Sequence, residues 1–191
     1  HYADYALGQF IRQLKDSGVW DDSLIMIYGD HVGLPKFSLD SREEELMAEI
    51  FGREYDYADM INVPLVIAGE GITYPRIFEQ VGGQADIMPT AANLLGIPMD
   101  GKIYFGQDIL NHTYNLLPQR YYLPSGSIIS SRGLFIPGIG YEDGTHYLLH
   151  SHKWHSGGEA ATEEEYERAL KLLRYSDSYI RQLPDRAGAP E

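Results

Sequence analysis

Asp30 and His31 are the side chains of this sequence best suited to chemistry, because they stand together at the end of an apolar run. The stretch "SLIMIYGDHVG" (residues 23–33) begins with mostly apolar residues and then changes abruptly to Gly-Asp-His. Residues 24–28 predict a short strand that is buried on both faces. Ligands of open α/β sheets collect beyond the carboxyl ends of the strands. We therefore expect a binding site at Asp30 and His31.

The two side chains offer a hard oxygen ligand and a borderline nitrogen ligand to a metal ion. A carboxylate beside a neutral imidazole suits Mn²⁺ or Zn²⁺ better than Ca²⁺. Such a cation polarises a phosphoryl or sulfuryl oxygen and stabilises the charge of a nucleophile. Gly29 and Gly33 flank the pair and allow the backbone to turn sharply and approach a ligand closely. The pair alone leaves an alternative open, in which Asp30 caps a turn and His31 bonds to the backbone.

A second group of candidate side chains lies in "THYLLHSHKWHSGG", which contains His146, His150, His152 and His155. On a strand, His150 and His152 point to the same side. The two predict either a second metal site or a polar rim over a substrate entrance. The alternative is a solvated strand end and loop, because no carboxylate lies at matching spacing.

The sequence offers no convincing nucleophile of its own. It contains no cysteine, which excludes disulfides, thiolate zinc sites and a cysteine nucleophile within the chain. Thr90 follows Pro89 in a predicted helix, where a packing role is the better interpretation. Asp86 stands near the start of that helix, where a carboxylate is favoured by the helix dipole, and we expect it and Gln84 to have structural roles.

Composition and charge limit the classes of partner. The 191 residues suffice for one domain with a sizeable core. The 28 acidic and 15 basic residues give a net charge of −13, which repels nucleic acid phosphates and favours cations. No run of 18 uninterrupted apolar residues occurs, so we predict no membrane-spanning helix within the chain.

The pattern of apolar residues predicts an α/β fold with helices and buried strands in alternation. Ser41 is expected to cap the second helix, with Glu44 three residues later as in a capping box. The chain predicts an α/β sandwich with a mainly parallel central sheet in residues 1–118, and a small antiparallel sheet with a terminal helix in residues 119–191. The predicted helices are residues 2–17, 41–51, 85–97 and 163–183, and the clearest predicted strands are residues 24–28, 62–71 and 145–150.

Five stretches of the sequence, in order along nearly the whole chain, resemble one family. Residues 1–33 resemble the core of the sulfatase and alkaline phosphatase superfamily, in particular its lipoteichoic acid synthase-like phosphoglycerol transferases. "NVPLVIAGEG" resembles the next core strand of that family, and "VGGQADIMPTAANLLGI" resembles its Gly-Gln-x-Asp-x-x-Pro-Thr helix. "FGQDIL" and "LKLLRYSDSYIRQ" resemble two later elements. An ordered set of this kind is more specific than any one motif.

The resemblance implies roles for Asp30 and His31 and a place for this chain in a larger enzyme. In the family the Asp-His pair binds a catalytic divalent cation, which implies Mn²⁺ here, with Zn²⁺, Mg²⁺ or Ca²⁺ as alternatives. The nucleophile, a further metal-binding acid, and an Arg and a His for the substrate phosphate lie upstream in the family. The chain is therefore expected to be a C-terminal portion that needs the N-terminal part of the same protein. By itself it is expected to have no transferase or hydrolase activity.

The family also implies a substrate and a location. We expect transfer of phosphoglycerol from phosphatidylglycerol, on the extracytoplasmic face of a bacterial membrane, in a protein anchored by an N-terminal region. A sulfatase or phosphodiesterase acting on sulfate or phosphate esters is the nearest alternative, because the whole superfamily shares the Asp-His pair. A non-catalytic domain that binds metal or glycan is an alternative from a different class.

Overall fold

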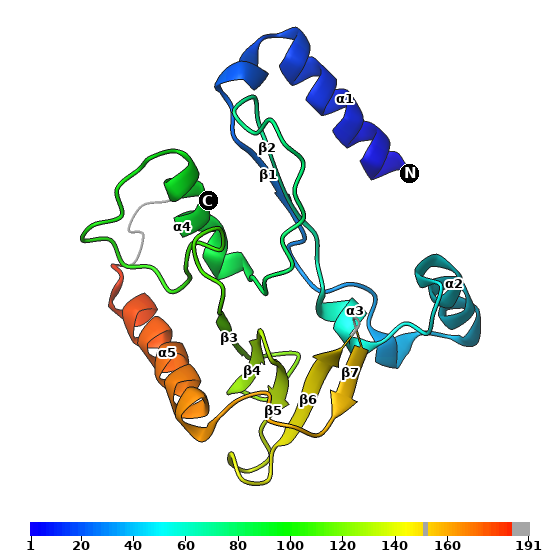
Figure 1. The fold of residues 1–191 in the computed structure, drawn as a ribbon, viewed down its shortest axis with the longest axis vertical. Coiled ribbons are helices and arrows are strands. Elements are labelled where there is room, and N and C mark those ends of the chain that lie inside the picture. Colours follow the sequence, from blue (N-terminus) through cyan, green and yellow to red (C-terminus); the bar gives the residue numbers. More distant parts are fainter. Residues whose placement is uncertain (151–152, 185–191) are drawn as a thin grey trace. The chain divides into compact units, whose positions relative to one another are not determined.

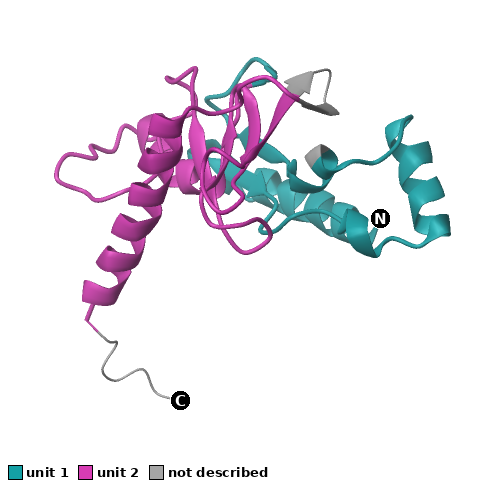
Figure 2. Ribbon diagram, turned by 90° about the horizontal axis from the view of Figure 1, so that it is seen from below, with its two compact units in different colours: residues 1–79 teal, residues 80–191 magenta. Residues whose placement is uncertain are grey.

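The computed structural model describes residues 1–150 and 153–184 of the chain (Figure 1). The chain divides into two compact units, residues 1–79 and 80–191, which Figure 2 shows in different colours. The expected division after residue 118 stays a prediction. The terminal sheet and helix both fall within the second unit.

The first unit consists of short helices and one pair of strands. Helix α1 (Tyr2–Asp16) has Ser17 as its C-cap, and Gly18 follows with φ +74°, as expected of a glycine that terminates a helix. The remaining elements are a 3₁₀ turn (Val19–Asp22), β1 (Ile25–Tyr28), a second 3₁₀ turn (Lys36–Ser38), α2 (Ser41–Phe51), α3 (Tyr57–Ile61) and β2 (Leu65–Ala68).

The cap of α2 differs from the prediction by one residue. Asp40, not Ser41, is the N-cap, and its carboxylate accepts hydrogen bonds from the backbone of Arg42 at 2.9 Å and Glu43 at 2.8 Å. Glu43 completes the capping box by accepting from the Asp40 N–H at 2.9 Å. Both registers satisfy the sequence pattern of a capping box, so the pattern alone did not distinguish them.

The expected mainly parallel central sheet is not found among the described residues. Strands β1 and β2 pair antiparallel, with Ile25 opposite Ala68 and Tyr28 opposite Leu65. Parallel strands that are buried on both faces are apolar runs, but an apolar run alone does not determine the direction of the neighbouring strand. The strands are also not fully buried within this chain, because Tyr28 is 47% exposed and Val66 50%.

The second unit contains the antiparallel sheet and the terminal helix, both of which were predicted. Its five strands pair in chain order, each antiparallel to the next. The long helix α5 (Glu163–Gln182) packs against β3 and β4 (Figure 1). The other elements are a 3₁₀ turn (Gln84–Asp86), α4 (Ile87–Leu94), β3 (Leu116–Gln119), β4 (Ser127–Ser130), β5 (Gly133–Ile136), β6 (Thr145–His150) and β7 (Lys153–Ser156).

The hydrophobic core of the second unit lies between this sheet and α5. Phe135 on β5 and Ile128 on β4 are fully buried there, together with Ala169 of the helix. The rings of Tyr141 and Tyr166 lie 5.2 and 5.6 Å from the Phe135 ring, distances typical of stabilising aromatic pairs. The terminal sheet and helix therefore form one packed body.

Glu165 ties the start of α5 to the rest of the second unit. It completes the capping box of Thr162, accepting from the Thr162 N–H at 2.7 Å, and it also accepts from the Tyr114 hydroxyl and the Arg132 guanidinium. Burial by itself raises the pKa of Glu165, but the hydrogen bonds and the Arg132 charge outweigh it and lower that pKa. Burial and the neighbouring Glu165 carboxylate raise the pKa of Tyr114 to about 12.

Acid is therefore expected to weaken the second unit through Glu165. Because the pKa of Glu165 is lowered in the folded chain, its contribution is complete above its ordinary value of 4.5 and is lost as the pH falls through the folded-state value. Glu165→Gln is expected to lower the free energy of unfolding by about 2 kcal/mol at neutral pH. Urea unfolding from pH 7 downward would measure this. The difference in free energy of unfolding between Glu165→Gln and wild type should become smaller below pH 4.5. A difference that is the same at every pH would contradict the stabilising role of the Glu165 carboxylate.

Candidate metal centre

The end of β1 places Asp30 and His31 on an exposed loop. The Gly29 N–H donates to the Pro64 carbonyl at 3.1 Å, next to the last strand pair, and the chain then leaves the sheet. The side chains of Asp30 and His31 are 89% and 73% exposed. Asp30 Oδ1 and His31 Nε2 lie 3.6 Å apart. The structure thus brings the two predicted ligands together at the expected strand end.

A backbone contact fixes the tautomer of His31. Its Nδ1 lies 2.6 Å from the Val32 carbonyl oxygen. A carbonyl only accepts hydrogen bonds, so Nδ1 is the donor in this contact, and in the neutral imidazole the lone pair is then on Nε2. This is the arrangement of a metal-binding histidine, whose other ring nitrogen donates to a carbonyl or carboxylate. Val32 supplies the partner that the sequence did not identify.

The two donor atoms fit a single divalent cation. Ligand bonds of about 2.1 Å to oxygen and nitrogen allow the two ligand atoms to be as much as about 4.2 Å apart, which includes the observed 3.6 Å. One carboxylate and one neutral imidazole are the donors expected for Mn²⁺ or Zn²⁺. In the part of the chain that the structure describes, no group of three or more His, Asp or Glu side chains gathers around one point. Asp30 and His31 would thus hold a cation jointly with further ligands.

Gly29 and Gly33 allow a close approach, but to this chain rather than to a ligand. A Cβ atom on Gly29 would lie 2.7 Å from the Val63 Cβ. One on Gly33 would lie 3.0 Å from the Tyr55 hydroxyl and 3.4 Å from the Met60 carbonyl oxygen. The glycines therefore let the loop pack against residues of the same unit.

The other predicted candidates lie in the second unit and are described there. His150 lies at the end of β6, but its side chain is outside the described set, as is the whole of His152, so the proposed rim stays a prediction. His146 has a structural role: its Nδ1 accepts from the Ala160 N–H at 3.2 Å, and its ring lies 4.8 Å from that of Phe135.

Asp86 and Thr90 join two of the recognised motifs, in agreement with the structural roles predicted for them. Asp86 is only 1% exposed. Its carboxylate accepts hydrogen bonds from the N–H groups of Gly83 and Gln107 and from the side-chain amide of Asn115, at 2.7 to 2.8 Å. The buried Thr90 hydroxyl donates to the Asp86 carbonyl at 2.6 Å and accepts from the Ile109 N–H at 3.2 Å. The "GGQADIMPT" and "FGQDIL" segments are thereby held together.

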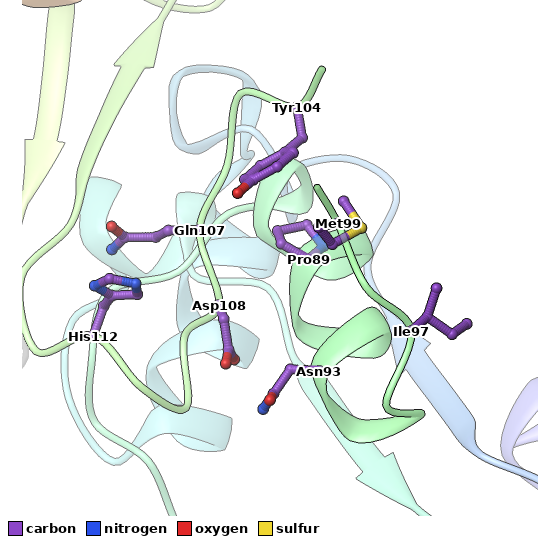
Figure 3. A pocket seen from close by; sticks show the side chains of 8 residues that line it. All are labelled: Pro89, Asn93, Ile97, Met99, Tyr104, Gln107, Asp108 and His112. Atoms are coloured by element: carbon purple, nitrogen blue, oxygen red, sulfur yellow. The ribbon is translucent and has the colours of Figure 1, made fainter. Parts of the chain in front are cut away.

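A pocket of about 440 Å³ opens beside these motifs in the second unit (Figure 3). Two of its polar side chains bond to the protein itself: Gln107 donates to the Tyr114 carbonyl at 2.6 Å, and Asp108 accepts from the Leu110 N–H at 3.0 Å. The GGQADIMPT and FGQDIL motifs contribute Pro89, Gln107 and Asp108 to its lining, but their residue types and spacing do not predict a pocket. Its lining residues are Pro89, Asn93, Ile97, Met99, Tyr104, Gln107, Asp108 and His112.

Comparison with known families decides the class of protein. The family described as Sulfatase matches residues 1–97, which is just over half of the chain and includes Asp30 and His31. The chain belongs to the sulfatase family. The resemblance seen in the ordered motifs is thus confirmed.

This sulfatase-family chain is similar to lipoteichoic acid synthases over nearly its whole length. It is 30% identical over 180 residues to lipoteichoic acid synthase of Staphylococcus aureus, covering 94% of this chain and 26% of the relative. It is 39% identical over 116 residues to the lipoteichoic acid synthase-like protein YvgJ of Bacillus subtilis, covering 58% of this chain and 18% of the relative. This sulfatase-family chain therefore spans about a quarter or less of these relatives.

A solved structure shows the same likeness in three dimensions. The crystal structure of lipoteichoic acid synthase LtaP from Listeria monocytogenes matches 98% of this sulfatase-family chain and 45% of its own, with a TM-score of 0.83 and 35% identity. The fold is thus LtaP-like. Among the helices described, none is both long and apolar enough to cross a membrane.

Proposed function

We propose that this chain is the metal-binding portion of a phosphoglycerol transferase, with Asp30 and His31 as ligands of its catalytic cation. The likeness to LtaP over 98% of the chain carries this proposal, because it favours the lipoteichoic acid synthase branch over other sulfatase-family enzymes. The 3.6 Å separation of Asp30 Oδ1 and His31 Nε2 supports their joint role. Mn²⁺ is the proposed cation.

The proposed reaction transfers phosphoglycerol from phosphatidylglycerol on the extracytoplasmic face of the membrane. A threonine hydroxyl, from a part of the protein outside these 191 residues, attacks the phosphorus. The bond to the diacylglycerol oxygen breaks, and diacylglycerol leaves with a proton. A hydroxyl of the growing polymer then attacks the threonine-bound phosphorus, the bond from phosphorus to the threonine oxygen breaks, and the threonine oxygen regains a proton as the polymer hydroxyl loses one.

Asp30 and His31 contribute binding and orientation. Asp30 supplies negative charge, and His31 supplies a neutral nitrogen that the Val32 carbonyl orients. The bound cation supplies positive charge near the reacting oxygens. Since the chain spans about a quarter of the Staphylococcus aureus relative, the other ligands and the nucleophile are proposed to come from the rest of the protein.

The test compares two substrates with the full-length protein. The protein is incubated with Mn²⁺ and phosphatidylglycerol labelled in its acyl chains, and diacylglycerol release is followed beside hydrolysis of an aryl sulfate. Diacylglycerol release without sulfate release is the expected result. Cleavage of the sulfate ester alone would move the protein to the sulfatases. Absence of both activities, with intact Mn²⁺ binding, would favour a binding domain.

A further inference from the structure

Backbone contacts, not side-chain packing, determine where the two proposed ligands lie. Asp30 and His31 are mostly exposed, so few neighbours restrain their side chains. Their loop, residues 29–36, is instead attached to residues 53–64, here called the anchor segment. At one end Gly29 donates to the Pro64 carbonyl at 3.1 Å, and further along Gly33 donates to the Met60 carbonyl at 2.7 Å. The loop thus continues the antiparallel course of β1 and β2.

Tyr55 attaches the part of the loop that follows His31 to the anchor segment through its side chain. Its hydroxyl donates to the Leu34 carbonyl at 2.9 Å, and the residue is only 5% exposed. Burial, with the negative charge of Asp59, raises the pKa of Tyr55, so the hydroxyl remains a donor at neutral pH. Gly33 leaves just enough space for this hydroxyl, as a Cβ there would lie 3.0 Å from it.

The anchor segment is itself held in place by a network of charges. Arg53 donates to both carboxylate oxygens of Asp59, at 2.7 and 2.6 Å, and Asp59 also accepts from the Asp56 N–H at 2.9 Å. Lys36, at the end of the loop, bonds to Glu54 at 3.1 Å. The ring of Tyr55 therefore projects from a fixed backbone, which is what a positioning side chain requires.

We propose that Tyr55 is a positioning residue of the metal centre: through the Leu34 carbonyl it holds the loop in the conformation that presents Asp30 and His31 to one cation. The inference rests on the proposed function, since it takes these two residues as the ligands. Tyr55 does not touch the cation or the substrate. Its effect is to reduce the number of loop conformations, so that less conformational entropy is lost when the ligands bind metal.

The test measures binding of Mn²⁺ alone to the full-length protein. Tyr55→Phe removes the hydroxyl but keeps the ring, which contacts Phe51 at a centroid distance of 5.4 Å. Tyr57→Phe removes a hydroxyl two residues further along the anchor segment and serves as the matched control. Isothermal titration is expected to show about tenfold weaker Mn²⁺ binding for Tyr55→Phe, the lower end of losses seen for outer-shell partners. Tyr57→Phe is expected to bind like wild type.

Two further measurements separate the possible results. The electron paramagnetic resonance spectrum of bound Mn²⁺ should broaden in Tyr55→Phe, while the metal-free melting temperature stays close to that of Tyr57→Phe. Equal Mn²⁺ affinity in the two tyrosine variants would overturn the inference, even where Asp30→Ala abolishes binding. Unchanged binding in both Asp30→Ala and His31→Ala would instead reject the proposed ligands, which is the failure of the proposed function.

Discussion

Replacing Asp30 by alanine in the full-length protein is expected to lower Mn²⁺-dependent diacylglycerol release about a thousandfold. The carboxylate is the only anionic ligand that this chain is proposed to supply, and a cation that stabilises transition-state charge contributes several kcal/mol to catalysis. The exposed position of Asp30 makes this a test of chemistry rather than of folding, because the 89% exposed side chain contributes little to packing. Diacylglycerol release at saturating phosphatidylglycerol measures the effect.

Two variants distinguish loss of the ligand from loss of charge. Glu70→Ala removes an exposed carboxylate from the same unit and is expected to leave the rate unchanged. Asp30→Asn keeps an oxygen at the site without its charge, and a tenfold excess of Mn²⁺ should restore part of its activity. Asp30→Ala with wild-type turnover at any Mn²⁺ concentration would reject the proposed role of this residue.

The sequence was sufficient to predict the strand end and the two polar side chains that follow it. The apolar run before Gly29 identifies β1, and the structure places Asp30 and His31 next to each other directly after it. Neighbours in sequence at the end of a strand need little tertiary information to be found together. The antiparallel terminal sheet and its helix were also predictable, since turn residues and helical periodicity are local signals.

The anchor of the loop could not be predicted, because it depends on contacts between distant residues. Tyr55 and Leu34 are 21 positions apart, and the chain has 15 tyrosines without a local signal that separates this one from the rest. The prediction of parallel strands was wrong for a related reason. Whether β1 and β2 pair parallel or antiparallel depends on the path of the residues between them, which the two strand sequences do not show. Ser41 and Asp40 show that even a local pattern is ambiguous when it fits two adjacent registers.

The contacts of Asp86 with residues distant in sequence could not be predicted either. Its residue type and position indicate only a favourable interaction with the start of a helix. In the structure its carboxylate accepts hydrogen bonds from nearby Gly83 and from Gln107 and Asn115, which are 21 and 29 positions away in sequence. Gly106 belongs to this junction as well, because a Cβ there would lie 2.1 Å from the Ala85 carbonyl oxygen. Two motifs of the family are thus explained by packing against each other.

Asp86→Ala is accordingly expected to destabilise the second unit by about 4 kcal/mol. The substitution leaves three donors without their acceptor in a site that is 1% exposed, and each unsatisfied buried group costs about 1–3 kcal/mol. Urea unfolding followed by circular dichroism measures the loss. An unchanged slope of the unfolding free energy against urea concentration would show that variant and wild type expose the same amount of surface on unfolding. The exposed Asp100, replaced by alanine, is the control for removing one charge.

Hydrogen exchange gives the prediction its local test. In Asp86→Ala the backbone amides of Gly83 and Gln107 lose their acceptor and are expected to exchange much faster, whereas amides in the β4–β5 ladder follow only the global loss of stability. Asp86→Asn keeps the shape but turns one oxygen into a donor that faces other donors, so an intermediate loss of about 2 kcal/mol is expected. A loss as small as that of Asp100→Ala, with Gly83 and Gln107 still protected, would show that other contacts hold the two motifs together.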